Sequence, residues 1–271
     1  MLTVLLLFLI GVISATFGSL VGLGGGIIIV PALIYLDPVM LHQGITTQSA
    51  VGTSLLVLIV TALSSSITFF RQRRIDVRSA LLFFIASGPA SVLGALMTGV
   101  LNPRQFQLWF GCFMLLMAVL MVIRPFLKPV KVNWKIQRSY TDPDGLTTTY
   151  GYHLLPALAT GFCVGFISGL FGIGGGSLFV PVMILLFSFP PHVATATSMF
   201  VIFLSSVAGS ITHVVAGEVN WHSALFLAPG AWIGGWLGAR IASRLSGGKL
   251  LWLLRITLFV LAFRMIWQGL G

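Results

Sequence analysis

Residues 18–36 read GSLVGLGGGIIIVPALIYL, and residues 168–186 read SGLFGIGGGSLFVPVMILL. Each stretch places three consecutive glycines inside a hydrophobic segment and follows them with an apolar run that contains Val-Pro. Glycine weakens a helix by about 1 kcal/mol per residue relative to alanine. The two stretches therefore predict a helix that is interrupted at the glycines, once in each part of the chain.

Composition places the chain among integral membrane proteins. Of its 271 residues, 57% are hydrophobic and only 7% are charged, and the mean hydropathy is +1.05. Soluble domains carry about 25% charged residues, whereas apolar stretches of about 20 residues, the length of a membrane-crossing helix, recur along this chain. The predicted fold class is an all-α integral membrane protein embedded in a lipid bilayer. The first segment follows Met1-Leu2-Thr3 without a positively charged region, so we do not expect a cleaved signal peptide.

The basic residues gather in two short segments between apolar spans. The formal net charge is +10, and most Lys and Arg residues lie in RQRRIDVR (71–78) and between Arg124 and Arg138. Basic loops of this kind are typical of the cytoplasmic side of a membrane protein. We therefore expect a multi-pass protein of the cytoplasmic membrane, with the loop 71–78 and the linker 125–152 in the cytoplasm and no nucleic-acid partner.

A tandem repeat runs through the chain. At an offset of 144 residues, GTSLLV (52–57) matches ATSMFV (196–201), whereas the glycine stretches are offset by 150. The difference indicates six extra residues in the first copy, near LHQGIT (41–46). The chain thus reads as two homologous halves.

We predict three parts from this repeat: a first transmembrane repeat at 1–124, a polar linker at 125–152, and a second transmembrane repeat at 153–271. The Asp-Pro-Asp-Gly sequence at 142–145 predicts a turn within the linker.

The leading hydrophobic block of each half is too long for one span. After the glycines, residues 27–36 form only ten residues, or about 15 Å of helix, which is shorter than the roughly 30 Å hydrocarbon core. Either the block crosses once as a discontinuous helix, which makes the repeats parallel, or it folds back as a re-entrant hairpin, which makes them inverted. Inversion would bring Arg240, Arg244 and Lys249 to the cytoplasmic side, so the charge bias favours inverted helical repeats. The total number of spans is then about eight to ten.

Consecutive glycines at membrane depth have a chemical use. They let the backbone turn with positive φ, and a helix that starts just after them directs unpaired amides and its positive dipole end at the break. Interrupted helices at matching places in two halves are typical of transport sites. We predict anion binding at Gly24–Gly26 and Gly174–Gly176, with Pro31 and Pro181 kinking or ending the short helices.

Close helix packing is the alternative role for glycine in a membrane helix. We assign that role to five other glycines: Gly11, Gly18, Gly234, Gly235 and Gly238.

Hydroxyl side chains lie at matching places early in the second span of each half, as Thr53-Ser54 and Thr197-Ser198. They could donate to a bound oxyanion, or they could bond to a backbone carbonyl one turn back in their own helix. Gln48 and His192 match each other six residues before the serines. His192 could bind substrate or titrate, or it could lie at the membrane interface.

The few acidic residues argue against a cation carrier and against an enzyme. All five fall in predicted loops or in the linker: Asp37, Asp76, Asp142, Asp144 and Glu218. Carriers of cations usually need buried carboxylates. The sequence also offers no metal-ligand cluster, no cofactor motif and no convincing nucleophile with a base, and we expect Cys112 and Cys163 to be small core residues. A binding site made of glycine amides and hydroxyls, without a carboxylate, favours an anionic substrate.

The motifs GLGGGIIIVPAL and GIGGGSLFVPVM, each followed by GTS or ATS at the start of the next span, resemble the sulfite exporter TauE/SafE family. The resemblance covers nearly the whole chain. It implies an anion permease that moves, usually outward, small sulfur oxyanions or organosulfonates such as sulfite or sulfoacetate. Carried over by motif, the implied site comprises ten residues: Gly24, Gly25, Gly26, Thr53, Ser54, Gly174, Gly175, Gly176, Thr197 and Ser198. The longer LHQGITTQSAVGTS of the first half departs from the second half and weakens the match of Gln48 with His192.

We therefore predict a secondary transporter that works by alternating access around a central amide-and-hydroxyl anion site. Its transport is driven by the anion gradient or coupled to protons, through a histidine such as His192 or through protonation of the substrate. The alternatives are an anion channel, a carrier for another small anion such as a carboxylate, or a membrane scaffold that does not transport. A homodimer is compatible with a carrier of this size, although no residue pattern requires it.

Overall fold

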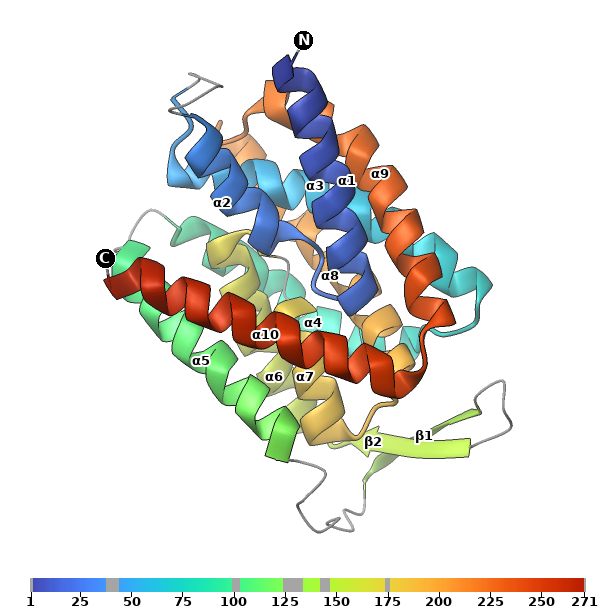
Figure 1. Cartoon of the computed structure of the whole chain (residues 1–271). Helices are drawn as coiled ribbons and strands as arrows, with labels where there is room; N and C mark the ends of the chain where they lie inside the picture. Colours follow the sequence, from blue (N-terminus) through green and yellow to red (C-terminus); the bar gives the residue numbers. More distant parts are fainter. Residues whose placement is uncertain are drawn as a thin grey trace.

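Ten helices and one β-hairpin make up the described part of the chain in the computed structural model (Figure 1). The structure describes residues 2–37, 44–98, 103–123, 134–141, 147–173 and 176–270. The first five helices are α1 (Leu2–Val21), α2 (Gly26–Leu36), α3 (Thr47–Arg71), α4 (Val77–Leu96) and α5 (Pro103–Ile123). The hairpin follows, as β1 (Ile136–Thr141) and β2 (Thr147–Tyr152). The last five helices are α6 (Leu154–Phe171), α7 (Gly176–Phe187), α8 (Pro191–Val215), α9 (Trp221–Arg244) and α10 (Gly247–Leu270).

The leading hydrophobic block of each half is divided into a long and a short helix at its glycines, as predicted. The backbone of Gly25 packs on α1, because a Cβ added there would lie 2.6 Å from the carbonyl oxygen of Ser14. The chain therefore folds back at the first break (Figure 1). The short helices have 11 and 12 residues, about 17–18 Å of helix, so neither is long enough to cross a bilayer alone.

Helices from the two halves pack against each other in pairs. The pairs are α1 with α9, α4 with α6, α5 with α10, and α3 with α8. Glycines bring α1 and α9 into close contact, because the Cα atoms of Gly234 and Gly238 face the carbonyl oxygens of Val12 and Thr16. This close approach confirms the packing role predicted for these glycines.

The paired helices α3 and α8 run in opposite directions. Asp76, just beyond the end of α3, touches Thr197 near the start of α8. Asn220, just beyond the end of α8, touches Thr53 near the start of α3. The helices α5 and α10 are also antiparallel, since Gly111 faces Ile266 while Leu108 and Arg104 face Gly269.

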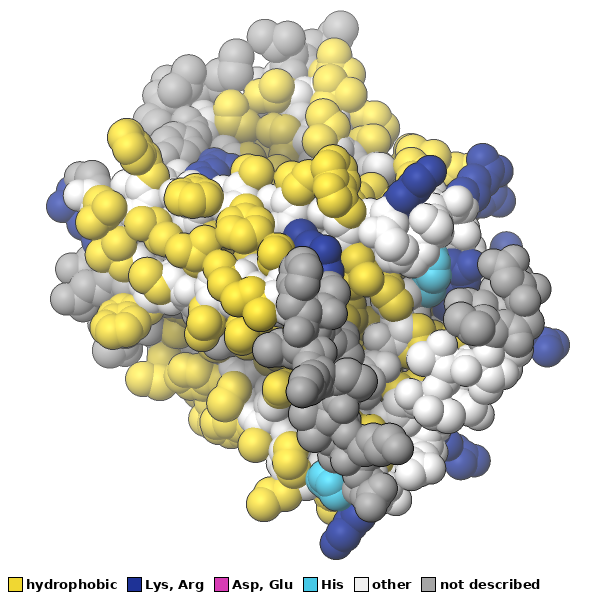
Figure 2. Space-filling view, turned by 60° about the horizontal axis from the view of Figure 1, so that its bottom comes forward, with side chains coloured by type: hydrophobic (Ala, Val, Ile, Leu, Met, Phe, Trp, Pro, Cys, Tyr) yellow, Lys and Arg dark blue, Asp and Glu magenta, His cyan; other side chains and the backbone are white. Residues whose placement is uncertain are grey.

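Six helices within the described residues are long and apolar enough to span a membrane: α1, α3, α4, α6, α8 and α10. Large apolar side chains also cover the outer surface, as the face in Figure 2 shows. Trp109 and Trp267, for example, are 77% and 81% exposed, which suits contact with lipid. The all-α integral membrane fold is therefore confirmed, whereas the total of eight to ten spans stays a prediction.

The two cysteines do not lie in the core. Cys112 in α5 and Cys163 in α6 are both exposed, so the expectation that they are core residues was wrong. In a bilayer an apolar side chain can face lipid as readily as protein, so an apolar context does not predict burial.

The linker contains a structured hairpin that the sequence analysis did not predict. Its strands are antiparallel, with Ile136 opposite Tyr152 and Thr141 opposite Thr147, and the predicted turn at 142–145 lies outside the described residues. The hairpin is docked, since the phenol of Tyr150 donates to Asp76 Oδ2 over 3.0 Å. Burial and this carboxylate raise the pKa of Tyr150 well above its ordinary value.

The second tyrosine of β2 lies in an aromatic cluster. Tyr152 Oη lies 2.8 Å from Ser79 Oγ at the start of α4, and its ring packs near Phe83 and Phe187. The hairpin is thus fixed to the end of the helix bundle where α3 ends and α4 begins.

Candidate functional site

The first break is built by three glycines in the left-handed region. Gly22, Gly24 and Gly25 have φ values of 80°, 84° and 95°, which only glycine adopts readily. The amides of Leu23 and Gly24 turn back to the carbonyl oxygen of Gly18, at 2.7 and 3.2 Å. This turn ends α1 and aims the chain into α2.

The start of α2 is buried at this break. Its N-cap is Gly25, which supplies no side chain, and Gly26 and Ile27 are both buried. The amides of the first turn of a helix have no acceptor within the helix, and the positive end of the helix dipole adds to them. The start of α2 therefore offers the kind of backbone donors that bind anions.

The two breaks lie against each other. The Cα of Gly26 faces the carbonyl oxygen of Gly172, which follows α6 and has a φ of 61°, and it also faces Ile173. No Cβ would fit at Gly26, because it would collide with this carbonyl. The predicted sites Gly174 and Gly175 lie outside the described residues, and Gly176 is the first residue of α7.

Both predicted serines connect the halves. Ser54 Oγ in α3 donates to Gly172 O over 2.8 Å, and Ser198 Oγ in α8 donates to Gly22 O over 3.0 Å. Ser198 also lies 3.0 Å from Thr195 O in its own helix. In this conformation the hydroxyl of each serine donates to a backbone carbonyl of the break in the other half.

Both predicted threonines accept hydrogen bonds from the opposite half. The backbone N–H of Asn220 donates to Thr53 Oγ1 over 2.9 Å, and that of Asp76 donates to Thr197 Oγ1 over 3.1 Å. Asn220 and Asp76 are the N-caps of α9 and α4. These bonds use a lone pair of each threonine and leave its hydroxyl hydrogen for another acceptor.

Gln48 and His192 lie away from the breaks, in the first turns of α3 and α8. Each precedes its serine by six residues, or about 9 Å along the helix axis. His192 Nδ1 lies 3.1 Å from a guanidinium nitrogen of Arg74. The structure therefore connects the described glycines of the breaks to Ser54 and Ser198. The two threonines instead bond to turns at opposite ends of the antiparallel pair α3 and α8, and Gln48 and His192 lie in the first turns of these helices.

The prolines lie inside the short helices rather than at their ends. Pro31 and Pro181 are each the sixth residue of their helix, in α2 and α7. The prediction that they could end these helices was therefore wrong.

A buried histidine pairs with a carboxylate, and the sequence analysis did not single it out. His213 is fully buried, and its Nδ1 lies 2.8 Å from Glu218 Oε2. Its Nε2 is buried and has no hydrogen-bond partner among the described residues. The pair adjoins the site, because the Cα of Gly52, beside Thr53, faces His213 Cβ and Glu218 O.

The turn that ends α8 places Glu218 beside His213. Gly217 has a φ of 72°, the N–H of Glu218 donates to His213 O over 2.9 Å, and the N–H of Gly217 donates to Val214 O over 3.1 Å. These are the two bonds of a Schellman motif. A histidine four residues before a Gly-Glu pair was the sequence signal for this pairing.

The turn that ends α3 has the same bonds. The backbone N–H of Arg74 donates to Phe69 O over 3.2 Å. The backbone N–H of Arg73, which has a φ of 54°, donates to Phe70 O over 3.0 Å. At the repeat offset of 144, Arg74 therefore occupies the place of Glu218.

Comparisons with known proteins identify a family and several related membrane transporters. The family model described as "Sulfite exporter TauE/SafE" matches residues 7–265. A protein from Bacillus subtilis, named "Probable membrane transporter protein YunE", is 47% identical over 267 residues, which cover 98% of each chain. A probable membrane transporter from Methanocaldococcus jannaschii is 28% identical over 80% of this chain and 74% of its own. The probable membrane transporter YfcA of Escherichia coli is 25% identical over 90% of this chain and 80% of its own. No solved structure matches the chain.

Proposed function

Because the chain belongs to the sulfite exporter TauE/SafE family and is a membrane transporter, we propose that it exports small sulfur oxyanions or organosulfonates. Sulfite and sulfoacetate are the substrates we expect. The transporter is a secondary carrier that works by alternating access, and its binding site lies where the two glycine breaks meet.

The contact between the breaks is the observation that carries this proposal. Gly26, the first residue of α2, lies against the carbonyl of Gly172, so the amide-rich start of a half-helix from one repeat meets the break of the other. Thr53 and Thr197 each precede a serine that bonds to a break, and the bonds from Asn220 and Asp76 leave their hydroxyl hydrogens unused. Such a site offers donors to an anion and needs no cation.

The described acidic residues support an anion over a cation as substrate. Asp37 accepts the N–H of Ile45 over 2.9 Å beyond the end of α2, Asp76 caps α4, and Glu218 pairs with His213. Each of these carboxylates lies at a helix end. A small oxyanion at the breaks therefore meets backbone amides, and Glu218, the carboxylate beside Gly52, is paired with His213.

The antiparallel course of α3 and α8 supports inverted repeats. Arg71 at the end of α3 shares a pocket with Arg240 of α9, whereas Glu218 lies at Gly52 near the start of α3. Gly52 and Arg71 are nineteen residues apart, or about 28 Å along the helix, close to the thickness of the hydrocarbon core. With the Arg71 end and the docked hairpin in the cytoplasm, the charges follow the positive-inside rule.

The pair of His213 and Glu218 gives proton coupling a structural basis in place of His192. The Glu218 carboxylate holds Nδ1 of His213, so Nε2 is the atom that can gain or lose a proton. Protonation there places a positive charge in a buried position next to Gly52 and Thr53. A bound anion at the breaks stabilises this charge, and the charge in turn stabilises the bound anion. Proton binding and anion binding are thereby coupled.

The test is transport by purified protein in proteoliposomes loaded with sulfite or sulfoacetate. We expect saturable flux that is accelerated by substrate on the opposite side. Gly26→Ala, which sets a methyl group against the Gly172 carbonyl, should abolish flux, whereas Gly248→Ala should not. Gly248 is the matched control because it also lies in the first turn of a helix, α10, but no atom lies within 4 Å of an added Cβ there.

Each remaining result selects an alternative. Flux that does not saturate indicates an anion channel, and saturable flux of a small carboxylate without flux of either sulfur anion indicates a different carrier. A folded Gly26→Ala protein that transports as well as wild type places the site elsewhere. Absence of flux for every anion tested supports a scaffold.

A further inference from the structure

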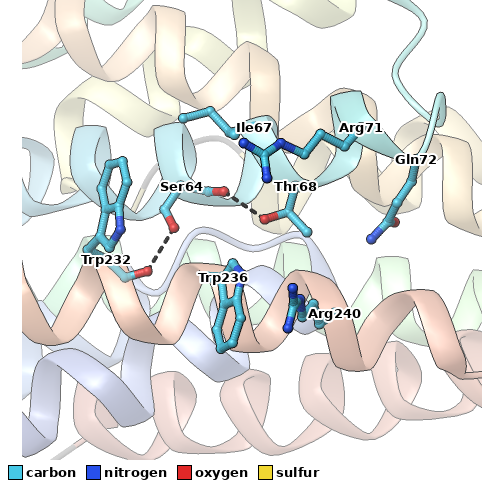
Figure 3. A pocket seen from close by; sticks show the side chains of 8 residues that line it. All are labelled: Ser64, Ile67, Thr68, Arg71, Gln72, Trp232, Trp236 and Arg240. Carbon is cyan, nitrogen blue, oxygen red and sulfur yellow. Dashed lines mark hydrogen bonds between the residues drawn. The ribbon is translucent and has the colours of Figure 1, made fainter.

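A pocket opens on the outer surface between α3 and α9, away from the two glycine breaks. Its volume is about 290 Å³, at the lower end of the roughly 300–1,000 Å³ of small-molecule sites. Thr68, Arg71 and Gln72 line it from the end of α3, and Trp232, Trp236 and Arg240 line it from α9 (Figure 3). Nothing in the transport site described above uses these side chains.

Two positive charges define one end of the pocket. Arg71 is the last residue of α3, and Arg240 lies one turn before the end of α9. The guanidinium of Arg240 lies 4.0 Å above the ring of Trp236, an arrangement that orients it beside the pocket. The described carboxylates have other partners, since Asp37 accepts from Ile45 N–H, Asp76 caps α4 and Glu218 pairs with His213.

A neutral polar group adds to the charged end. The Oε1 of Gln72 is buried and has no hydrogen-bond partner among the described residues. A ligand that carries a hydroxyl near its anionic group could donate to this oxygen, while the arginines donate to the anion. An unpaired buried acceptor is costly, so the pocket is more stable with such a ligand.

The other side of the pocket is apolar and faces outward. Ile67, Trp232 and Trp236 line it and are 38%, 46% and 39% exposed. Tryptophan with arginine at the end of a spanning helix is typical of the membrane–water interface. A ligand that fits both sides has an anionic head and a hydrocarbon chain.

We propose that this pocket binds the head group of an anionic phospholipid with a hydroxylated head, such as phosphatidylglycerol. The phosphodiester lies between Arg71 and Arg240, the head-group hydroxyl reaches Gln72, and an acyl chain runs along Trp232 and Ile67. Basic pockets between spanning helices on the cytoplasmic side are known sites for lipid head groups. The proposal does not depend on the transported substrate.

The test uses the full chain in nanodiscs of phosphatidylcholine, titrated with phosphatidylglycerol that carries brominated acyl chains. Bromine quenches nearby tryptophans, so we expect more quenching at a low fraction of phosphatidylglycerol than at the same fraction of brominated phosphatidylcholine. Replacing both tryptophans, Trp232→Phe with Trp236→Phe, should remove this excess. Equal quenching by both lipids would overturn the proposal.

Charge removal identifies the arginines that bind. Arg71→Gln with Arg240→Gln should raise the phosphatidylglycerol fraction needed for half-maximal quenching at least tenfold. The double variant Arg78→Gln with Arg244→Gln removes the same charge from exposed positions outside the pocket and should leave the titration unchanged. The charge-conserving Arg71→Lys with Arg240→Lys should fold and keep most of the binding. Equal loss in the two Gln variants would reduce the effect to general surface charge and overturn the site.

Competition separates a lipid from a soluble anion. We expect millimolar inorganic phosphate and sulfite to leave the quenching by phosphatidylglycerol unchanged at constant ionic strength. Displacement by either anion would overturn the lipid proposal and identify the pocket as a site for free anions.

Discussion

The hydroxyl of Ser54 donates to the carbonyl oxygen of Gly172 over 2.8 Å and so connects α3 of the first half to the glycine break of the second. Ser198 makes the counterpart bond to Gly22 over 3.0 Å. Each break therefore depends on a side chain from the other half for its shape. The site at the breaks belongs to neither half alone.

Removal of either serine should loosen the breaks to a similar degree. We expect Ser54→Ala and Ser198→Ala each to reduce stability by about 1 kcal/mol, because each leaves a buried carbonyl without its donor. Thermal unfolding of the detergent-solubilised protein measures the loss. Ser210→Ala is the control, because Ser210 is buried in the same helix as Ser198 but bonds to its own helix at Val207. An equal loss in this control would show that the bonds between the halves have no special weight.

The threonines should affect substrate binding as well as stability, since loss of the Thr53 hydroxyl also leaves the N–H of Asn220 without its acceptor. We expect Thr53→Val to raise the KM for sulfite about tenfold, equivalent to about 1.4 kcal/mol, because it removes a hydroxyl donor without changing side-chain size. Thr53→Ser keeps the hydroxyl and should keep the KM within about twofold. The measurement is initial flux against sulfite concentration in proteoliposomes. An unchanged KM in folded Thr53→Val protein would remove Thr53 from the site.

The pH dependence of transport should follow His213 rather than His192. We expect flux to respond to a pH gradient, because the imidazole of a histidine can carry the coupled proton. His213→Gln should make flux indifferent to a pH gradient, because glutamine can still bond to Glu218 but does not titrate. His192→Gln is the matched control and should keep the wild-type response. The reverse pattern would place the proton at His192, and a wild-type flux that ignores pH would exclude proton coupling.

Docking of the hairpin should weaken in alkali. The pKa of Tyr150 is raised in the folded protein, so the folded state holds its phenol proton more tightly than the unfolded chain. The stabilisation is complete below the unfolded pKa of about 10 and is lost as pH rises above it. Melting temperatures between pH 8 and 11 should therefore fall less steeply in Tyr150→Phe than in wild type. Tyr140→Phe, in the other strand, should follow wild type, and identical slopes in all three proteins would exclude Tyr150 as the cause.

The breaks in the helices could be predicted because glycine changes the backbone conformation at its own position, whatever packs around it. The triplet at Gly24–Gly26 and the short helix after it follow from backbone conformation and length alone, and α2 begins at Gly26. The same local logic placed Thr53 and Thr197 early in their helices. The sequence did not reveal that Asn220 and Asp76 bond to these threonines, because such contacts depend on how the halves pack.

The hairpin was missed for a related reason. Residues 147–152 read TTTYGY, and threonine and tyrosine favour strands, but the segment lies in a polar linker. Its stability comes from Tyr150 at Asp76 and Tyr152 at Ser79, contacts between segments about 70 residues apart in the chain. The pairing of His213 with Glu218 was missed although a glycine turn lay between them, because a histidine near a helix end is usually only solvated.

The matching turns after α3 and α8 have one more consequence. Their backbone bonds are the same, yet Arg74 occupies in one turn the place that Glu218 occupies in the other. The two ends of the α3–α8 pair therefore carry opposite charges, a guanidinium at one end and a carboxylate at the other. A nearly repeated backbone thus surrounds a small anion with different local electrostatic potentials at the two ends of the molecule.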